Sequence, residues 1–238
     1  MDRRIRSEVM RTWDEVLDHE YAVIEDVYKW VGHPCRVVEI GCGSQGFLGR
    51  RDGRLRELER HSVGIDIDRD SLARNRQVAY HVCGSCYSLP LKTSSVDMVV
   101  CRWLLEHLER PEEALRELAR VLRPGGFLYV KTPNLMNYAM LASWLTPVAF
   151  HNRVRVALGA HENIPTFYRA NTRRRLKELA AGTGFTVRRL ESLPYSYMYY
   201  AFNKELFLVM RGVSRWVGKL TQRLQLALIC VLEKVQDP

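Results

Sequence analysis

The sequence has no apolar run of the length that a membrane-spanning helix needs, and its first residues are charged: Asp2, Arg3, Arg4, Arg6 and Glu8. A spanning helix takes about 20 consecutive apolar residues, and a secretory signal needs an apolar segment near the N-terminus. We therefore expect neither a span nor a signal, and we expect a cytoplasmic location. Internal repeats and low-complexity tracts are also missing. At 238 residues, 47% of them hydrophobic, the sequence predicts a single globular domain over residues 1–238.

Cysteine is too scattered in the sequence for a disulfide framework. The six cysteines lie mostly in strand-like contexts, which is typical of reduced, buried thiols: Cys35, Cys42, Cys83, Cys86, Cys101 and Cys230. Cys83 and Cys86 form one Cys-x-x-Cys pair, but neither a second pair nor a histidine cluster accompanies it. A closed zinc site takes four such ligands, so we expect no metal.

Acidic residues are scarce in the C-terminal part of the chain. The formal net charge is +9, and residues 1–150 carry 21 basic and 21 acidic side chains, so the whole excess lies in residues 151–238. A basic segment on a neutral core fits an anionic substrate, a membrane surface or a nucleic acid, and it fits a merely solubilising surface equally well.

Short strand-like segments alternate with helical ones through the middle of the chain. The strand-like segments are rich in valine and isoleucine and cover Arg36–Ile40, Val63–Ile67, Ala79–Cys83, Val96–Cys101 and Phe127–Thr132. The clearest helix covers Pro111–Leu122 and stops before Pro124-Gly125-Gly126. This alternation predicts a parallel sheet with helices on both faces. Ligands of such sheets bind beyond the carboxyl ends of the strands.

Two further regions flank this core, residues 33–134. Residues 1–32 form a predicted N-terminal helical cap, with its helix over Arg3–Trp30. Residues 135–238 hold, in order, an apolar stretch at Leu135–Phe150, a helix from about Thr172 to Gly182, a strand at Thr186–Leu190, a helix from about Tyr195 to Leu224 and a strand at Leu226–Leu232.

The helix near the C-terminus has a basic face. Arg211, Arg215, Lys219 and Arg223 recur every four residues, so they share one side of the helix, and apolar residues fill the remainder. Such a basic amphipathic helix lies on a membrane surface, covers a lipid-like substrate, or simply docks on the sheet. The sequence leaves these three alternatives open.

The segment Val37–Gly46 places a glycine-rich turn between an apolar strand and a helix start. Glycines let the backbone turn tightly and approach a ligand, and the first turn of a helix presents unpaired N–H groups. The segment therefore predicts a cradle for a nucleotide cofactor. Gly41, Gly43 and Gly46 literally match the dinucleotide fingerprint of dehydrogenases. Asp66, at the end of the second strand, suits ribose hydroxyls whichever nucleotide binds.

Motifs after the turn decide which cofactor is expected. They are, in order, Ser88-Leu89-Pro90-Leu91, Ser95-Val96-Asp97-Met98-Val99-Val100, Leu105-Glu106-His107-Leu108 and Val121-Leu122-Arg123-Pro124-Gly125-Gly126-Phe127-Leu128. With them, residues 33–191 resemble the class I S-adenosylmethionine-dependent methyltransferases, in particular the group that includes the ubiquinone-biosynthesis methyltransferases. The resemblance implies S-adenosylmethionine as the cofactor. It also implies a Rossmann-like, doubly wound α/β fold of seven strands, the seventh antiparallel, with a helical insert or cap.

The resemblance also implies a role for each cofactor-binding residue. Those at the methionine end of the cofactor are Glu39 and the backbone of Gly41, Cys42 and Gly43. Asp66 holds the ribose hydroxyls, and the residues around the adenine and the sulfonium are Ile67, Ser85, Cys86 and Arg102. The sequence departs from the family pattern at two positions. Gln45 stands where a glycine is usual, which moves the third glycine to Gly46, and Ser85 stands where an acid is common.

Catalytic residues are harder to predict, because methyl transfer from a sulfonium is an in-line displacement with a neutral leaving group. Positioning supplies much of the acceleration, and a general base is needed only where the acceptor carries a proton. His107 and His161 are the candidates. His107 could instead pack or cap a helix start, whereas His161 falls in the insert where the resemblance places acceptor contacts. Asn134, after the fifth strand, either orients the acceptor or makes a turn.

The expected function is methyl transfer to an oxygen, less readily to nitrogen or carbon, of a small or lipid-linked metabolite. The partner is then a small-molecule or amphiphilic acceptor, anionic if the basic segment binds it, and the C-terminal helix could make peripheral membrane contact. Two alternatives stay open, an RNA methyltransferase that uses the basic region and a non-catalytic cofactor-binding or scaffold protein. The loop Cys101–Leu104 lacks the Asn/Asp-Pro-Pro-aromatic element of base-methylating enzymes, which counts against nucleic acid. The sequence does not indicate an oligomeric state.

Overall fold

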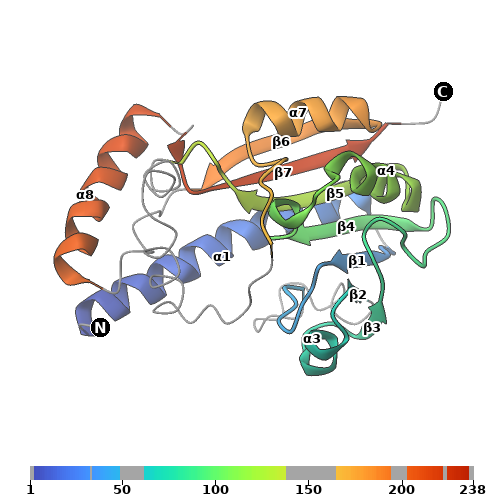
Figure 1. Ribbon diagram of the computed structural model, residues 1–238, viewed down its shortest axis with the longest axis horizontal. Coiled ribbons are helices and arrows are strands. Elements are labelled where there is room, and N and C mark those ends of the chain that lie inside the picture. The colour runs from blue at the N-terminus through green and yellow to red at the C-terminus, as the bar shows by residue number, and fades with distance from the viewer. Residues whose placement is uncertain are drawn as a thin grey trace.

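Seven strands form one sheet in the computed structural model, which describes residues 3–32, 34–48, 62–137, 165–193, 203–221 and 224–235. The strand order is β3-β2-β1-β4-β5-β7-β6 (Figure 1). The strands are β1 Val37–Ile40, β2 Val63–Asp66, β3 Tyr80–Cys83, β4 Val96–Arg102, β5 Leu122–Pro133, β6 Phe185–Leu193 and β7 Ala227–Lys234. β7 pairs antiparallel with β5 and β6, whereas the remaining pairs are parallel. The predicted Rossmann-like fold with an antiparallel seventh strand is confirmed.

Both faces of the sheet are buried at its centre. Side chains along a strand alternate between the two faces, and strands covered on both sides read as continuous apolar runs. In β4, Val99 and Cys101 pack on one face and Met98 and Val100 on the other, and none of the four is exposed. The apolar run Val96–Cys101 in the sequence is therefore a central strand.

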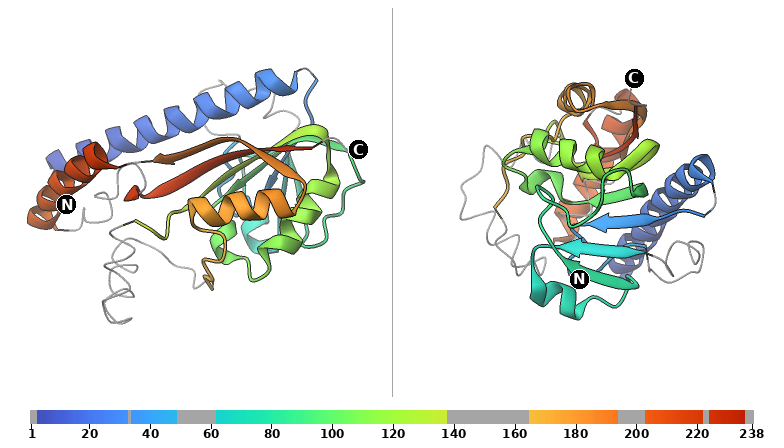
Figure 2. Two further views of the ribbon diagram at one scale, coloured as in Figure 1. Left: turned by 90° about the horizontal axis from the view of Figure 1, so that it is seen from above. Right: turned by 90° about the vertical axis from the view of Figure 1, so that its right-hand side faces the viewer.

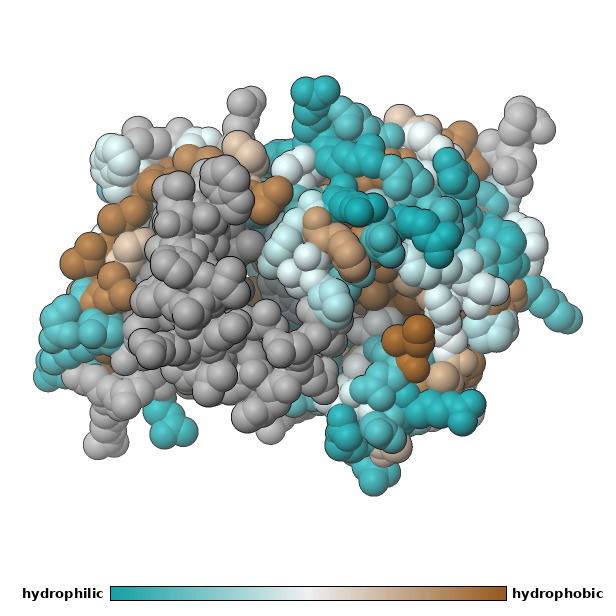
Figure 3. Space-filling view, viewed as in Figure 1, coloured by the Kyte–Doolittle hydropathy of each residue, from teal (hydrophilic) through white to brown (hydrophobic). Residues whose placement is uncertain are grey.

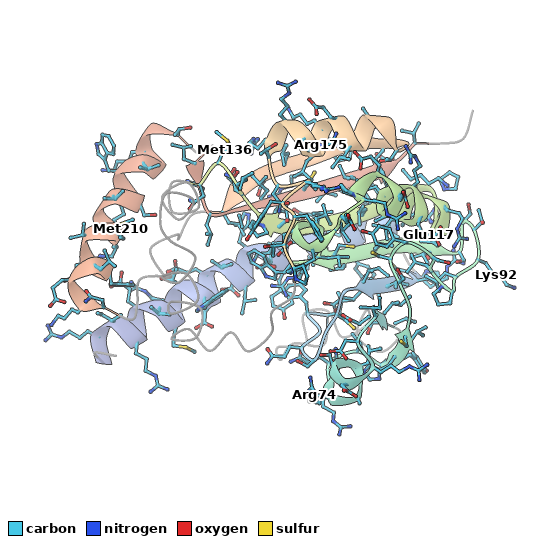
Figure 4. The ribbon with its side chains drawn as sticks, viewed as in Figure 1. Arg74, Lys92, Glu117, Met136, Arg175 and Met210 are labelled. Carbon is cyan, nitrogen blue, oxygen red and sulfur yellow. The ribbon has the colours of Figure 1, made fainter. Side chains whose placement is uncertain are left out.

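Helices cover the two faces as the alternating pattern predicts. α1, Arg3–Val31, lies along one face, whereas α4, Pro111–Val121, and α7, Arg173–Gly182, lie on the other (Figure 2). α7 begins where predicted, because the Thr172 side chain accepts a hydrogen bond from the Arg175 N–H (3.1 Å). The guanidinium of Arg175, which is labelled in Figure 4, pairs with Glu112 of α4 and so ties the two helices together.

The fifth strand begins earlier than predicted, at Leu122 instead of Phe127. Gly125 has φ +71°, and the pairing of β5 with β4 shifts register between Val96 and Met98, so the ladder continues through an irregular segment. A Cβ on Gly126 would lie 2.9 Å from the Arg123 carbonyl oxygen and 3.0 Å from that of Asp97. Only glycine fits so close to two backbone carbonyls. The Pro-Gly-Gly segment therefore has the composition of a helix stop, although it is part of β5.

The helix near the C-terminus is shorter than predicted. α8 covers Lys204–Leu220, because the Asn203 side chain caps it by accepting from the Leu206 N–H (2.9 Å). α8 packs against the first turns of α1, with Phe207 and Ile5 in one apolar cluster. Residues 194–202 and Arg223 are not among those that the structure describes. No helix in the described part is long and apolar enough to cross a bilayer.

Three other predictions fall wholly or partly on residues that the structure does not describe. The apolar stretch Leu135–Phe150 is described only as far as Asn137. The helix start expected at the end of Val37–Gly46 is not found among the described residues, which end at Leu48 in this region. His161 is also outside the described residues. The division into cap, core and acceptor-side region stays a prediction.

Candidate functional site

The carboxyl ends of β1, β2 and β4 meet at one edge of the sheet. β1 pairs with β2 on one side and with β4 on the other, so the strand order reverses at β1. In open α/β sheets, ligands bind outside the carboxyl ends at such a reversal. Every cofactor residue expected from the sequence lies on or just after β1, β2, β3 or β4, so the fold gathers them here.

The turn after β1 uses two glycines in left-handed conformations. Gly41 has φ +73° and Gly43 has φ +49°, values that residues with a Cβ adopt only at a cost. The Gly41 N–H donates to the Ile65 carbonyl (2.8 Å), which holds the turn against β2. A Cβ on Gly41 would meet Leu104 at 3.1 Å, whereas one on Gly43 would meet no atom of the described chain within 4 Å. Gly41 is thus close-packed, and Gly43 borders open space where a ligand can lie.

Asp66 lies directly beside this turn. Its Oδ2 accepts from the Gly43 N–H (2.8 Å), and its Oδ1 accepts from the Asp68 N–H (2.9 Å). The carboxylate is partly exposed, and each oxygen has a second lone pair for a ligand hydroxyl. The sequence predicted both the acid and the turn, and the parallel pairing of β1 with β2 brings them together.

Glu39 supports the turn from inside the protein. Its side chain is buried, and its carboxylate accepts from the N–H groups of Phe47 (2.9 Å) and Leu48 (3.3 Å). The N–H groups of Phe47 and Leu48, which directly follow the turn, are therefore bonded to Glu39. A Cβ on Gly46 would lie 3.0 Å from Val78 and 3.3 Å from the Glu39 carboxylate, so the third glycine is required by packing. A contact of Glu39 with the methionine end of a cofactor stays a prediction.

Asn75 is a further residue of the turn that sequence reasoning missed. It follows α3, Arg69–Arg74, and its Nδ2 donates to the carbonyl oxygens of Gly43 (2.8 Å) and Cys42 (3.3 Å). The residue is buried, so these hydrogen bonds fix the back of the turn. Burial raises the pKa of the Cys42 thiol to about 12, so the thiol is neutral and serves as packing. Nothing in the sequence distinguishes Asn75 from a polar residue at a helix end.

The loop after β3 lies beside Asp66. The Gly84 N–H donates to the Asp66 carbonyl (3.0 Å), and the Ser85 hydroxyl accepts from the Tyr87 N–H (3.2 Å). Cys86 is half-buried, and burial raises the pKa of its thiol to about 11. Ile67, directly after Asp66, is 74% exposed, which is unusual for an isoleucine and leaves an apolar surface at this edge. The described residues contain no group of three or more side chains that could hold a metal ion.

Arg102, at the end of β4, belongs to a buried ionic cluster on the α1 side of the sheet. Its Nε donates to the Glu20 carboxylate (2.8 Å), and its guanidinium stacks 4.0 Å above the Phe47 ring. Lys131 of β5 pairs with the other Glu20 oxygen. Burial by itself would raise the pKa of Glu20, but the two cations bring it below its usual range. The guanidinium is thus held by Glu20, and a contact with a sulfonium stays a prediction.

The ionic cluster connects α1 to the glycine turn. Tyr21, next to Glu20, stacks on Phe47 with ring centroids 4.6 Å apart, and Phe47 is the residue whose N–H bonds to Glu39. The sequence predicts that α1 is a helical cap but does not indicate the contact between Glu20 and Arg102, because these residues are 82 positions apart in the chain.

His107 lies on η1, a 3-10 turn of residues Leu105–His107 that follows β4. Its Nδ1 is 2.7 Å from the Pro165 carbonyl oxygen. A carbonyl only accepts, so Nδ1 carries a proton, and in the tautomer protonated at Nδ1 the lone pair is on Nε2. The N–H groups of Phe167 and Tyr168 also bond to the Glu106 carbonyl, which fastens residues 165–168 to η1.

A buried polar chain lies behind η1. Asn171 Nδ2 donates to the Thr132 hydroxyl (2.6 Å), which donates to the Glu106 carboxylate (3.1 Å). Burial raises the pKa of Glu106 to about 7. Asn134 takes the turn role: its Nδ2 donates to the Gln225 carbonyl (2.8 Å), and its Oδ1 accepts from the Met136 N–H (3.1 Å). The sequence indicated Asn134 but gave no role to Glu106.

Comparison with known proteins matches the same strands and turn. Residues 38–130, which span β1 to β5, match the model of the family described as "Methyltransferase domain". This part of the chain is thus similar to the class I S-adenosylmethionine-dependent methyltransferases, as the sequence motifs predict. Over 121 residues it is 35% identical to a probable S-adenosylmethionine-dependent methyltransferase of Mycolicibacterium smegmatis, a match that covers 48% of this chain and 46% of that protein. Over 107 residues it is 35% identical to a ubiquinone biosynthesis O-methyltransferase of Cupriavidus pinatubonensis, covering 42% of this chain and 41% of the relative.

A solved structure extends the likeness of the methyltransferase domain to nearly the whole chain. Geranyl diphosphate C-methyltransferase of Streptomyces coelicolor, solved with S-adenosyl-L-homocysteine, superposes with a TM-score of 0.60 and 12% identity, covering 96% of this chain and 83% of that one. At this identity the likeness concerns the fold. The chain spans less than half the length of the two relatives matched by sequence.

Proposed function

We propose that this protein transfers the methyl group of S-adenosylmethionine to an oxygen, less readily to a nitrogen or carbon, of a small or lipid-linked metabolite. The observation that carries the proposal is the Asp66 carboxylate beside the Gly43 N–H, at the reversal point of the strand order. The open space at Gly43 and the exposed side chain of Ile67 lie on the same edge. These features fit a nucleoside that carries an amino-acid tail.

The residues of the site would divide the cofactor between them. Asp66 would accept hydrogen bonds from the two ribose hydroxyls, and the backbone of Gly41, Cys42 and Gly43 would hold the amino-acid end. Ile67 would cover one face of the adenine, with Ser85 and Cys86 at its edge. When bound, the cofactor supplies a methyl group on a sulfonium that leaves as a neutral thioether.

Two residues would act indirectly in this arrangement. Glu39 would keep the turn in shape through Phe47 and Leu48, because its carboxylate already accepts from their N–H groups. Arg102 would hold Phe47 in place from the α1 side. The pairing with Glu20 would also offset the positive charge of Arg102 if a sulfonium binds beside it.

His107 is the general base that we propose for an acceptor hydroxyl. The Pro165 carbonyl holds the Nδ1 proton, so Nε2 can accept the proton that the hydroxyl loses as the methyl group arrives. His161, from the part of the chain that the structure does not describe, stays the second candidate. The acceptor that we propose is a small or amphiphilic molecule, with an anionic group if the basic region contacts it, and the cytoplasmic location stays a prediction.

Calorimetric titration with S-adenosylmethionine tests the cofactor site. Asp66→Ala should weaken binding about 10- to 100-fold, because a hydrogen bond to a charged group contributes about 1.5–3 kcal/mol. Asp68→Ala is the matched control: this acid is in the same loop and caps α3, so its loss affects the helix and not the ribose. Equal affinities of the wild type and Asp66→Ala, or no binding by the wild type, would remove the cofactor assignment.

Turnover separates the remaining alternatives. Incubation of the protein with methyl-labelled cofactor and a cell extract should label a small or lipid fraction. Label in RNA, with an RNA affinity that falls steeply as salt rises, would instead favour the RNA methyltransferase, because phosphate contacts release counterions. Cofactor binding without any labelled product would favour a scaffold.

A further inference from the structure

One face of α8 is turned away from the rest of the described chain. Phe207 and Met210 lie on the inner face, where they pack with Ile5 and Val9 of α1 (Figure 4). The opposite side, called the outer face here, consists of seven exposed residues: Glu205, Leu208, Val209, Gly212, Arg215, Trp216 and Lys219. Their spacing of three, four and seven residues places them on one side of the helix.

The outer face carries three large apolar side chains, whereas the exposed surface of an ordinary helix is mostly polar. Leu208 is 44% exposed, Val209 61% and Trp216 64%. Single exposed apolar residues are common on protein surfaces, but three large ones on one helical face mark an interaction site. Figure 3 shows hydrophobic surface gathered along α8 at the edge of the molecule.

Positive charge accompanies this apolar surface at the C-terminal end of α8. Arg215 and Lys219 are one turn apart and flank Trp216, and both are exposed. The acid of the outer face, Glu205, is ten residues before Arg215, about 15 Å along the helix axis. Arg211, which the sequence placed on the same basic face, instead pairs with Glu8 of α1 (2.6 Å) and lies at the border of the inner face.

We propose that the outer face of α8 docks on an anionic membrane surface. Trp216, Leu208 and Val209 would enter the boundary between headgroups and acyl chains, where tryptophan is favoured because it is apolar with one polar N–H. Arg215 and Lys219 would contact anionic headgroups. The inner face stays on α1, so docking requires no unfolding of the helix.

The charges favour a membrane over the other occupants. In a symmetric dimer with parallel helices, Arg215 and Lys219 of the two copies would lie near one another and repel, and an antiparallel dimer would offer only one acid, Glu205, to the two basic residues of each copy. A nucleic acid would match the charge but would leave the leucine and valine without an apolar partner. An anionic bilayer matches both parts of the face. The proposal concerns a surface away from the glycine turn and does not depend on the methyl-transfer reaction.

Docking through α8 would also orient the catalytic edge. α8 is fixed to the start of α1, and α1 contacts the glycine turn through the stacking of Tyr21 on Phe47. One continuous helix of 29 residues therefore connects the docking face to the cofactor turn. Such a link would give the site a constant position relative to the bilayer.

Co-sedimentation of the full chain with vesicles tests the docking surface. The vesicles are phosphatidylcholine alone, or phosphatidylcholine with about a quarter phosphatidylserine, and binding is expected with the anionic vesicles only. Arg215→Gln/Lys219→Gln should weaken it about 25-fold, because each basic side chain near an anionic surface is worth about a factor of five. Trp216→Ser should weaken it about 10-fold through the loss of inserted apolar area.

The matched control removes the same charge elsewhere. Lys92→Gln/Lys177→Gln neutralises two exposed lysines outside α8 and should leave vesicle binding within about two-fold of the wild type. Cofactor titration of each variant checks that the fold is intact. Equal losses in the control and in the α8 pair, or no binding of the wild type to anionic vesicles, would overturn the proposal. So would a dimer in sedimentation analysis that Trp216→Ser dissociates.

Discussion

Glu20 is the residue whose replacement tests the buried ionic cluster most directly. The Glu20 side chain is not exposed at all, and its partners Lys131 and Arg102 are 1% and 11% exposed. Glu20→Gln keeps the shape and one carbonyl acceptor but leaves two buried cations without their anion. Breaking a buried ion pair from one side costs about 3–5 kcal/mol. Since glutamine retains a hydrogen bond, we expect about 3 kcal/mol of lost unfolding free energy.

Urea unfolding followed by circular dichroism measures this loss. With a slope of about 3 kcal/mol per molar urea, the midpoint should fall by about 1 M. Glu15→Gln is the control on the same helix, because Glu15 is 53% exposed and its ion pair with Arg11 spans 3.9 Å. An exposed pair of this kind contributes about 0.5 kcal/mol or less.

The pH dependence of the difference has a definite sign. The pKa of Glu20 is lowered in the folded protein, so its carboxylate stabilises the fold above the unfolded pKa, near 4.5. This stabilisation is lost as the pH falls through the lowered folded pKa. The free energy of unfolding of the wild type should therefore exceed that of Glu20→Gln at neutral pH. In acid the two values should approach each other.

Two outcomes would refute this account of the cluster. The first is a Glu20→Gln midpoint indistinguishable from that of Glu15→Gln. The second concerns the triple variant Glu20→Met/Arg102→Met/Lys131→Met, which removes all three charges and should recover most of the loss. A triple variant less stable than Glu20→Gln would show that side-chain shape, and not charge balance, accounts for the effect.

Three further predictions concern separate parts of the chain. Burial raises the pKa of Glu106 to about 7, so its ionisation opposes folding. Glu106→Gln should therefore gain about 3 kcal/mol of unfolding free energy relative to the wild type as the pH rises from about 4.5 to above 7. Thermal melts at pH 5 and pH 8 measure this, and a difference between the two proteins that is the same at both pH values would contradict it. Gly182→Ala should raise the unfolding free energy by about 0.5–1 kcal/mol, because an added Cβ in α7 meets no described atom within 4 Å. Gly126→Ala should lower it by about 2 kcal/mol, because the added Cβ would lie too close to two backbone carbonyl oxygens. Equal urea midpoints of the two variants would exclude this difference in backbone constraint. His107→Gln should lower the labelling rate about 100-fold or more with cofactor affinity unchanged, and a rate near that of the wild type would remove the base assignment.

The sequence was enough to predict the succession of strands and helices along the chain and the position of the glycine turn. Short runs rich in valine and isoleucine predict strands, because β-branched side chains pack well on a pleated surface and the runs are too short for typical helices. The alternation of strands and helices then forces a parallel sheet, whose carboxyl ends collect the loops. Asp66 could therefore be placed near Gly43 from the sequence, since adjacent parallel strands end at the same edge.

The contacts of several predicted residues could be known only from the tertiary structure. Glu39 and Arg102 were identified from motif positions, but a motif does not give the partner of a side chain. Glu39 bonds to Phe47 and Leu48, and Arg102 pairs with Glu20, 82 residues away. The same is true of α8. The helical period of its sequence defines two faces, but which of them is buried is known only from the contact of Phe207 with Ile5. Pattern and spacing fix local structure, whereas the pairing of charges and apolar faces depends on which distant segments the folded chain brings together.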